Sequence, residues 1–302
     1  MEEKKTPAKR ELAEALEALG MPGVGEECIT AFICAEDGYK YAAWLVERGG
    51  EKYVLKRAKG LELEAYRCFF VPKKPYAPAF CGSCELNGEP YFLMEYCEGG
   101  DLRRCDTERL LKALDALIAM QEEFWQREEL YGSAVTIERA LKAIEDRGSW
   151  LGSELLEAAY ARFVEAYKQT PRTLCHEDLL PMNLLIGERA VLIDWEYGGV
   201  LPYLSSFARL IAHCREEQDA YFYMTRADRE LAISYYYENL PKKHGISYEE
   251  YSRSLDLFLF YEYCEWIMLG NRYDSRSDER YGYYTKLAED MAGKILHAEG
   301  LA

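Results

Sequence analysis

The segment from Thr173 to Gly199 constrains this chain more than any other, because three polar residues stand in it at fixed spacing. They are His176, Asp178 and Asn183, in the pattern His-x-Asp-x4-Asn. A loop that catalyses phosphoryl transfer requires this spacing: the Asp accepts the proton of the attacking hydroxyl, and the Asn turns back to hold a metal ion. The pattern therefore predicts Asp178 as the catalytic base, Asn183 as a metal ligand and His176 as a brace of the loop.

A short hairpin should follow this loop. Residues 183–186 and 190–193 are apolar strand segments, and Gly187-Glu188-Arg189 is the turn between them. The second strand ends in Asp194, which would face the same cleft and bind the Mg²⁺ that bridges the ATP phosphates. In the alternative interpretation His176 and Asp178 cap each other in a turn, and Asp194 is a buried strand end. The strand-turn-strand context favours the catalytic interpretation.

The sequence of this segment, CHEDLLPMNLLIG followed by AVLIDWEYGG, closely resembles the catalytic segment of the choline kinase and aminoglycoside phosphotransferase superfamily. Asp-Leu-Leu-Pro after the His, and Ile-Asp-Trp-Glu-Tyr-Gly at the metal-binding Asp, are most similar to bacterial choline kinase-type members. The resemblance implies a two-lobed, protein-kinase-like α+β fold. Residues 1–96 would form a small N-lobe with a five-stranded antiparallel sheet and a helix. Residues 97–302 would form a larger, mainly helical C-lobe with the catalytic loop and the substrate pocket.

The local patterns of the first hundred residues agree with such a sheet. Three strands are expected within residues 28–56, with Asp37-Gly38 and Gly49-Gly50 as hairpin turns. Two more are expected at 80–86 and 90–96. The turn at 35–39 is where a kinase keeps its phosphate-covering loop, although no G-x-G-x-x-G motif is present there.

The chain then leaves the sheet through Gly99-Gly100. This segment resembles the hinge between the lobes of a kinase. The resemblance places the backbone groups of Glu95 and Cys97 against the edge of the adenine.

Lys56 ends the third strand in the sequence Val-Leu-Lys, which corresponds to the strand lysine that pairs with the ATP phosphates in kinases. The alternative is an exposed strand lysine such as Lys52. A partner carboxylate is expected on the following helix, where Glu62 and Glu64 both qualify and point to different faces. Aromatic residues stand two, five and six positions after Glu64, so we expect Glu64 to be the partner.

The C-terminal half is mainly helical in pattern and rich in Tyr, and these aromatic residues bear on the substrate. A quaternary ammonium group binds well against Trp and Tyr faces. Tyr263 and Trp266 lie three apart on one helix face and match the paired aromatic positions of choline kinase-like proteins, with Glu262 and Glu265 able to add charge. The other candidates for substrate contact are Trp195 and Glu196. The ordinary alternative is that an aromatic stripe at helical spacing belongs to the core.

Ser206 is a departure from the family pattern. Members usually carry an Asp at this point, which hydrogen-bonds the backbone of the catalytic loop. A serine has a shorter reach and no charge, so we expect the loop to be held differently. This departure puts the rate in doubt more than the fold.

Composition limits the partners and the compartment. The net charge of −16, from 37 basic and 53 acidic residues, argues against nucleic acid and is compatible with a cationic substrate. No apolar run approaches membrane-spanning length, and the charged N-terminus lacks a signal-peptide core, so we expect a cytoplasmic protein. Ten scattered cysteines are typical of reduced, packed thiols. The lone Cys81-Gly-Ser-Cys84 is expected to be a plain turn rather than a metal or redox site.

Together these features predict ATP- and Mg²⁺-dependent transfer of the γ-phosphoryl group to a hydroxyl of a small, cationic molecule. Choline or another amino alcohol is the leading substrate, and an aminoglycoside is the second. A further alternative is a non-catalytic nucleotide-binding pseudokinase, motivated by Ser206 and by the missing Gly-rich loop. The sequence leaves open the oligomeric state and the preference for ATP over GTP.

Overall fold

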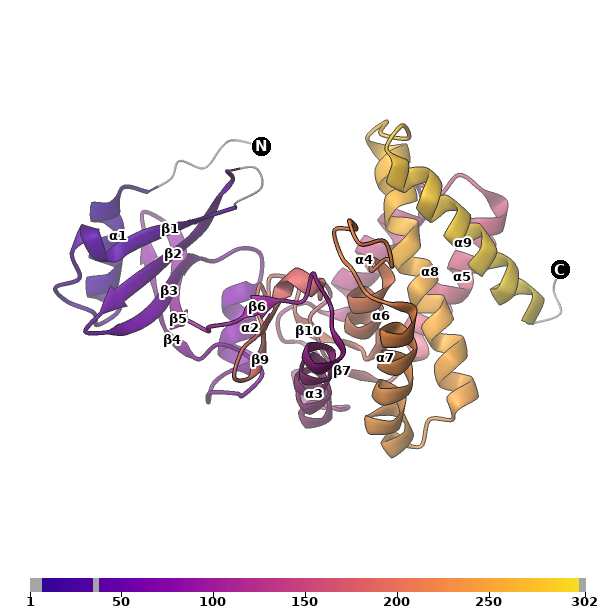
Figure 1. The fold of residues 1–302 in the computed structure, drawn as a ribbon, viewed down its shortest axis with the longest axis horizontal. Coiled ribbons are helices and arrows are strands. Elements are labelled where there is room, and N and C mark those ends of the chain that lie inside the picture. The colour runs from indigo at the N-terminus through magenta and orange to yellow at the C-terminus, as the bar shows by residue number, and fades with distance from the viewer. Residues whose placement is uncertain (1–6, 35–37, 299–302) are drawn as a thin grey trace.

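The computed structural model describes residues 7–34 and 38–298, which form a small β-rich lobe and a larger helical lobe (Figure 1). The elements of the small lobe are α1 (Lys9–Ala18), η1 (Glu26–Cys28), β1 (Ile29–Ile33), β2 (Lys40–Arg48), β3 (Glu51–Arg57), α2 (Glu62–Phe69), β4 (Phe80–Leu86) and β5 (Glu89–Glu95). The elements that follow are β6 (Gly100–Asp101), α3 (Thr107–Glu123), η2 (Glu128–Leu130), α4 (Ile137–Gly148), α5 (Glu154–Gln169), β7 (Arg172–Cys175), η3 (Pro181–Asn183), β8 (Leu184–Ile186), β9 (Ala190–Leu192), β10 (Gly199–Pro202), α6 (Leu204–Ala212), α7 (Arg226–Asn239), η4 (Pro241–His244), α8 (Tyr248–Arg272) and α9 (Glu279–Ala298).

The small lobe is built on an antiparallel sheet with the strand order β1-β2-β3-β5-β4. The side chains of this sheet pack into two separate hydrophobic cores, because successive residues of a strand point to opposite faces. Leu55 and Leu93 pack with α1 on the outer face, whereas Val54 and Phe92 pack with α2 on the inner face. Lys56 lies two residues after Val54, so the same alternation turns it toward the inner face.

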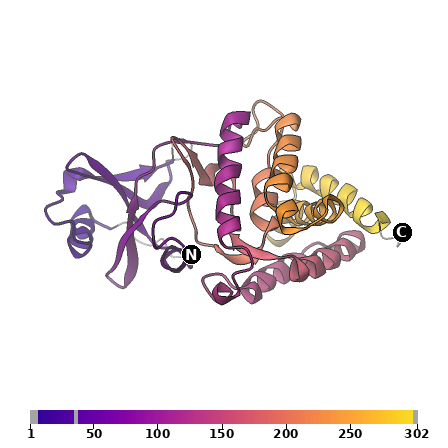
Figure 2. The same cartoon turned by 90° about the horizontal axis from the view of Figure 1, so that it is seen from below.

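The large lobe is a set of helices around one continuous core, which also includes the inner face of the small-lobe sheet. Figure 2 shows α3 between the sheet and the orange helices, with the yellow helix α9 at the far end. Helix α8 packs against α6 and α9, and β7 pairs with β10. The hairpin β8–β9 joins β6 in a three-stranded sheet next to the connection between the lobes.

The five-stranded sheet, its order along the chain and the helical C-lobe are confirmed as predicted from the sequence. We propose the lobe boundary at residues 96 and 97, because β5 ends at Glu95 and β6 already pairs with β8. The expected phosphate-covering turn at 35–39 lies mostly outside the described residues.

The segment Cys81–Cys84 is not the plain turn that was expected. It is part of β4, where Cys81 is exposed and Cys84 contacts α1. Within residues 7–34 and 38–298, no helix is both long and apolar enough to cross a membrane.

Candidate active site

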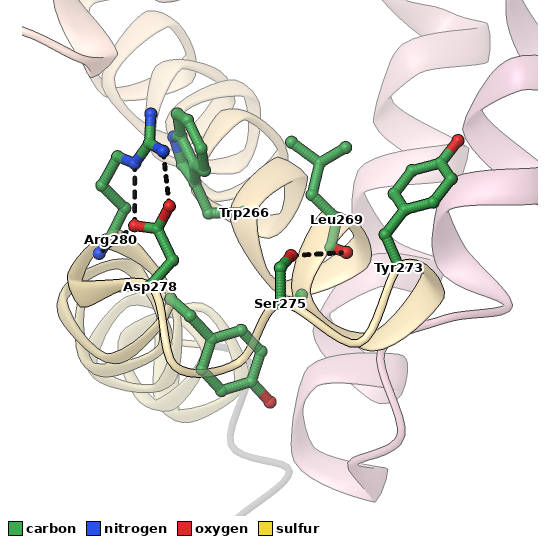
Figure 3. A pocket seen from close by; sticks show the side chains of 8 residues that line it. Trp266, Leu269, Tyr273, Ser275, Asp278 and Arg280 are labelled. Carbon is green, nitrogen blue, oxygen red and sulfur yellow. Dashed lines mark hydrogen bonds and ion pairs between the residues drawn. The ribbon is translucent and has the colours of Figure 1, made fainter.

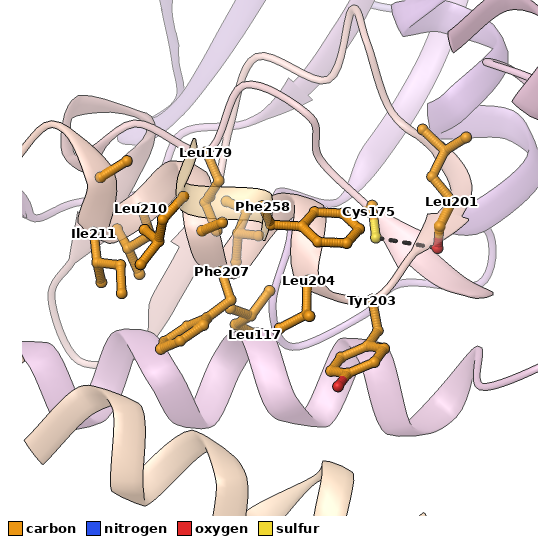
Figure 4. Close-up of a cluster of buried hydrophobic side chains, with 14 of the residues drawn as sticks. Leu117, Cys175, Leu179, Leu201, Tyr203, Leu204, Phe207, Leu210, Ile211 and Phe258 are labelled. Carbon is orange, nitrogen blue, oxygen red and sulfur yellow. Dashed lines mark hydrogen bonds between the residues drawn. The ribbon is translucent and has the colours of Figure 1, made fainter. Parts of the chain in front are cut away.

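The catalytic loop begins at the end of β7 and is anchored by apolar side chains on both sides. Cys175 and Leu179 are fully buried, and Figure 4 shows them in a cluster with Leu204, Phe207 and Phe258. Between these anchors Glu177 adopts a left-handed backbone with φ of 60°. This conformation costs free energy in a residue other than glycine, and such residues occur preferentially at functional sites. The anchors therefore hold a strained loop that presents Asp178.

His176 lies within the loop, with its ring turned toward the end of the hairpin. Its ring is fully buried against Trp195, and Nε2 lies 2.7 Å from the carbonyl oxygen of Ile193. A carbonyl only accepts, so Nε2 carries the proton and donates it. Burial lowers the pKa of His176, which keeps the ring neutral. The contact ties the catalytic loop to the end of the hairpin, two elements that meet at the site.

Asp178 and Asn183 lie in contact across the loop. The side-chain amide of Asn183 donates to the backbone oxygen of Asp178 at 2.7 Å and approaches its carboxylate Oδ2 at 3.4 Å. Asp178 is partly buried, and burial raises the pKa of its carboxyl even though Arg209 acts in the opposite direction. With its amide nitrogen committed to the loop, Asn183 keeps its oxygen Oδ1 available as a ligand.

The hairpin brings Asp194 back to Asn183. Leu184 pairs with Leu192, and the N–H of Ile193 donates to the carbonyl of Asn183 at 3.0 Å. Asp194 therefore stands directly beyond the open end of the hairpin, with a left-handed φ of 69°. Burial would raise its pKa, but the ammonium of Lys56 outweighs burial and holds that pKa below its usual value.

Lys56 reaches Asp194 from β3. Its ammonium contacts Glu62 Oε1 at 2.6 Å and Asp194 Oδ1 at 2.5 Å. Burial alone would lower the pKa of Lys56, but the two carboxylates raise it above its ordinary value, so the lysine stays charged. A charged lysine between a helix carboxylate and the second loop carboxylate is suited to hold an anionic group.

The prediction that Glu64 is the partner of Lys56 was wrong. Glu62 is fully buried and faces Lys56, whereas Glu64 accepts a hydrogen bond at 2.8 Å from the backbone N–H of Ala134. The buried residues of α2 are Glu62, Ala65, Tyr66 and Phe69, at the i, i+3, i+4, i+7 spacing of one helix face. The aromatic spacing that suggested Glu64 does not match that period.

The segment after β5 passes close to the hairpin turn. A side chain at Gly187 would place its Cβ 2.2 Å from the carbonyl of Glu98, so only glycine allows this approach. The carboxylate of Glu95 accepts from Arg189 at 2.7 Å and from the backbone N–H of Ala79 at 3.0 Å. These contacts fix the connection between the lobes, and the roles of the Glu95 and Cys97 backbones toward adenine stay predictions.

The two candidates after Asp194 differ in position. Trp195 is fully buried, donates from its indole to the Leu192 carbonyl and packs on Phe70, so it belongs to the core and does not contact substrate as expected. Glu196 is half-buried beside Tyr197, which the prediction omitted. Tyr197 is 49% exposed, and its pKa is raised to about 12, first by a hydrogen bond to Glu196 and further by the charges of Asp178 and Asp194. An aromatic residue next to Glu196 in the motif was the available signal.

Tyr263 and Trp266 lie on one face of α8, as their spacing predicts, but other side chains cover them. Tyr263 is 6% exposed and packs on Tyr284. The guanidinium of Arg280 lies 4.1 Å from the centre of the Trp266 ring, and Figure 3 shows Arg280 held there by Asp278. Trp266 and Arg280 line the wall of a 290 Å³ cavity between α8 and α9, and Tyr263 does not. A cation from solvent would have to displace Arg280 to reach this ring.

The donor set at the hairpin end suits a divalent metal ion of the hard type. Asn183 Oδ1 and the carboxylate of Asp194 are oxygen ligands, which Mg²⁺ prefers. The only cluster of His, Cys, Asp or Glu side chains with metal-ligand geometry in the described part of the chain lies elsewhere, at His213, Glu262 and Glu265. A two-ligand protein site is typical of Mg²⁺ that is held mainly by phosphates and water.

Comparisons with known proteins find relatives of this chain in sequence and in fold. Protein LicA of Haemophilus influenzae is 26% identical over 142 residues, 47% of this chain and 50% of that protein, so the chain spans about half the length of the curated relatives it matches. A putative aminoglycoside phosphotransferase from Ralstonia eutropha superimposes with a TM-score of 0.59 at 15% identity, covering 94% of this chain and 96% of the other.

An aminoglycoside phosphotransferase solved as a ternary complex with ADP and hygromycin B superimposes with a TM-score of 0.54 at 16% identity, over 93% and 96% of the two chains. At these identities the solved structures establish the kinase-like fold. The model of the phosphotransferase enzyme family matches residues 35–240, which include Lys56, the catalytic loop and Asp194. The chain is therefore a member of the phosphotransferase enzyme family.

Proposed function

We propose that this protein transfers the γ-phosphoryl group of ATP, with Mg²⁺, to a hydroxyl of a small cationic molecule such as choline or another amino alcohol. The observation that carries the proposal is the convergence of Lys56 and Asp194 at 2.5 Å, beside a hairpin that returns Asp194 to Asn183. Residues that are far apart in sequence thus meet where a nucleotide phosphate and its metal would lie.

Each residue has a distinct task in this reaction. Asp178 accepts the proton of the attacking hydroxyl, and Lys56 holds the phosphates while Glu62 holds Lys56. Asn183 and Asp194 would hold Mg²⁺, which neutralises charge on the phosphates when bound. Phosphoryl transfer needs little covalent participation by the protein, so positioning and charge neutralisation supply the rate.

The surroundings of Asp178 favour a cationic acceptor. Tyr197 offers an exposed aromatic face, and the carboxylates of Glu196, Asp178 and Asp194 are close enough to act on its hydroxyl. The phenol is neutral near neutral pH, and a neutral ring flanked by carboxylates attracts ammonium groups. A hydroxyl carried two or three bonds from an ammonium group would then lie near Asp178.

The test is ATP turnover with Mg²⁺ against a panel of amino alcohols, aminoglycosides and uncharged polyols. We expect stimulation by amino alcohols, and Asp178→Asn should lower kcat by about 100- to 10,000-fold. Asp194→Asn should abolish turnover without unfolding the protein. The matched control is Asp290→Asn on the exposed side of α9, which should leave turnover unchanged.

Other outcomes would separate the alternatives. Stimulation by aminoglycosides alone would make the protein an aminoglycoside phosphotransferase. ATP binding without stimulated turnover by any acceptor would favour a nucleotide-binding pseudokinase. The departure at Ser206 no longer supports the pseudokinase alternative, because Ser206 accepts a hydrogen bond from the backbone of the catalytic loop. The proposal places the reaction in the cytoplasm, where ATP is abundant and the ten free thiols would stay reduced.

A further inference from the structure

Helix α6 carries one charged residue, Arg209, in an otherwise uncharged run whose other members are all buried. We propose that Arg209 is a positioning residue for the catalytic base: it holds one carboxylate oxygen of Asp178 and so leaves the other for the substrate hydroxyl. This inference rests on the proposed function and names a residue that no motif in the sequence includes. The available signal was a lone arginine within LSSFARLIA.

The contact between Arg209 and Asp178 is directional. Nη2 and Nε of the guanidinium lie 3.0 and 3.3 Å from the same oxygen, Asp178 Oδ1. The other oxygen, Oδ2, faces the amide of Asn183 at 3.4 Å. Two donors on one oxygen define the rotation of the carboxylate, because the guanidinium is planar and its donors are fixed relative to one another.

The far side of the guanidinium is itself held by α8. Nη1 of Arg209 lies 2.7 Å from Glu262 Oε2 and 2.5 Å from Glu265 Oε2, and 3.2 Å from His213 Nε2. His213, Glu262 and Glu265 have the spacing of a metal site, but Nη1 of Arg209 already contacts one atom of each. The carboxylates that the sequence suggested for a substrate cation are thus engaged with Arg209.

The burial of this network argues that its geometry is stable. The side chain of Arg209 is 12% exposed, and those of Glu262 and Glu265 are 6% and 20% exposed. Arg147 adds a second positive charge, 3.6 Å from Glu265 Oε1. An arginine fixed at both ends in this way has little freedom to rotate, so the orientation of Asp178 follows from the packing of α6 against α8.

The experiment compares Arg209→Ala and Arg209→Lys with the unmodified protein. Misplacement of a reacting group by about 1 Å can lower the rate by about 100-fold. We therefore expect Arg209→Ala to lower kcat by about 30- to 300-fold, with the KM for ATP unchanged. Arg209→Lys keeps the positive charge but loses the two fixed donors of the guanidinium, and its kcat should fall about tenfold. Guanidinium ion at millimolar concentration should restore part of the kcat of Arg209→Ala and none in Asp178→Asn.

Several results would overturn the inference. One is a folded Arg209→Ala protein whose kcat is unchanged. A second is a raised kcat in this variant, which would mean that Arg209 masks the base. A third is a loss of kcat that guanidinium does not relieve. If Arg209→Ala does not fold, Glu265→Gln weakens the same clamp and should lower kcat about threefold to tenfold without changing the KM for ATP. Arg229→Lys, a half-buried arginine that donates to Cys214, is the matched control and should retain full kcat.

A structural readout separates this inference from the proposed function. In a crystal of Arg209→Lys, the Asp178 carboxylate should adopt a different rotation or two alternative rotations. An unchanged, single orientation would contradict the positioning role, even if no acceptor substrate has yet been found. Absence of turnover in the unmodified protein would instead count against the proposed function.

Discussion

The backbone N–H of His176 donates a 2.8 Å hydrogen bond to the hydroxyl of Ser206. Both residues are fully buried, and the bond joins the catalytic loop to the first turn of α6. Ser206 stands where the family pattern has an aspartate, and it makes the same kind of contact with the loop backbone. The substitution therefore changes the charge of the acceptor and keeps the connection.

We expect Ser206→Ala to lower the free energy of unfolding by about 1–3 kcal/mol, because it leaves a buried N–H without an acceptor. Urea unfolding followed by circular dichroism measures the change. The control is Ser205→Ala: this neighbour is also buried, but its hydroxyl lies near the side chains of Glu177 and Tyr167 and, within the described residues, accepts from no N–H of the loop, so the loss should be below about 1 kcal/mol. Equal losses for both variants would contradict the role of the bond.

The pairing of Lys56 with Glu62 predicts different effects at two neighbouring carboxylates. Glu62→Gln removes the charge 2.6 Å from the lysine, and we expect it to lower kcat/KM for ATP by about 10- to 100-fold. Glu64→Gln keeps an oxygen that can accept from Ala134 and should stay within about twofold. Steady-state kinetics with ATP as the varied substrate tests this, and a larger loss at Glu64 would reverse the assignment.

Local patterns were sufficient for the sheet and for the catalytic loop. Strand alternation and the Gly-containing turns lie within short segments, and the loop motif places Asn183 and Asp194 at the two ends of one hairpin, with Asp178 five residues before Asn183. The prediction of Glu64 over Glu62 failed for a local reason as well. Residues two positions apart on a helix point about 200° away from each other, so the buried face must be identified with the helical period. Counting i+3, i+4 and i+7 from Glu62 gives Ala65, Tyr66 and Phe69, all buried.

The contacts of the C-terminal half could not be derived in this way. Arg209 meets Glu262 across 53 residues, and Arg280 reaches Trp266 from the next helix. Which partner covers an aromatic ring or a carboxylate depends on how α6, α8 and α9 pack. A helical stripe predicts only that one face is buried, and it leaves open whether a substrate or the chain itself fills that face.

The exposed ring of Tyr197 and the covered ring of Trp266 lead to a prediction about the acceptor. We expect Tyr197→Leu to raise the KM for an amino alcohol by about tenfold, since a cation–π contact contributes about 0.5–2 kcal/mol. Trp266→Leu should change this KM by less than about twofold, because Arg280 already lies over its ring. A larger effect at Trp266 would show that Arg280 moves away and that the ring binds the acceptor.

Glu177 gives the protein a defined dependence of stability on pH. Burial raises the pKa of its carboxyl to about 7, with the charge of Glu262 acting in the same direction and the Ser205 hydroxyl, Arg147 and Arg209 opposing it. The ordinary value is 4.5, so between these two pH values the folded state binds a proton that the unfolded chain has released. This group therefore stabilises the fold least at high pH: its contribution is fully present below pH 4.5 and is lost as pH rises through about 7.

Glu177→Gln keeps the shape of the side chain and removes its titration. We expect the variant to gain stability relative to the unmodified protein as pH rises from 5 to 8, because it has no proton to lose. Urea unfolding at pH 5 and pH 8 measures this difference, and Glu289→Gln on the exposed side of α9 controls for the loss of one carboxylate. A difference that is the same at both pH values would mean that Glu177 is already ionised at pH 5, and that the arginines around it outweigh its burial.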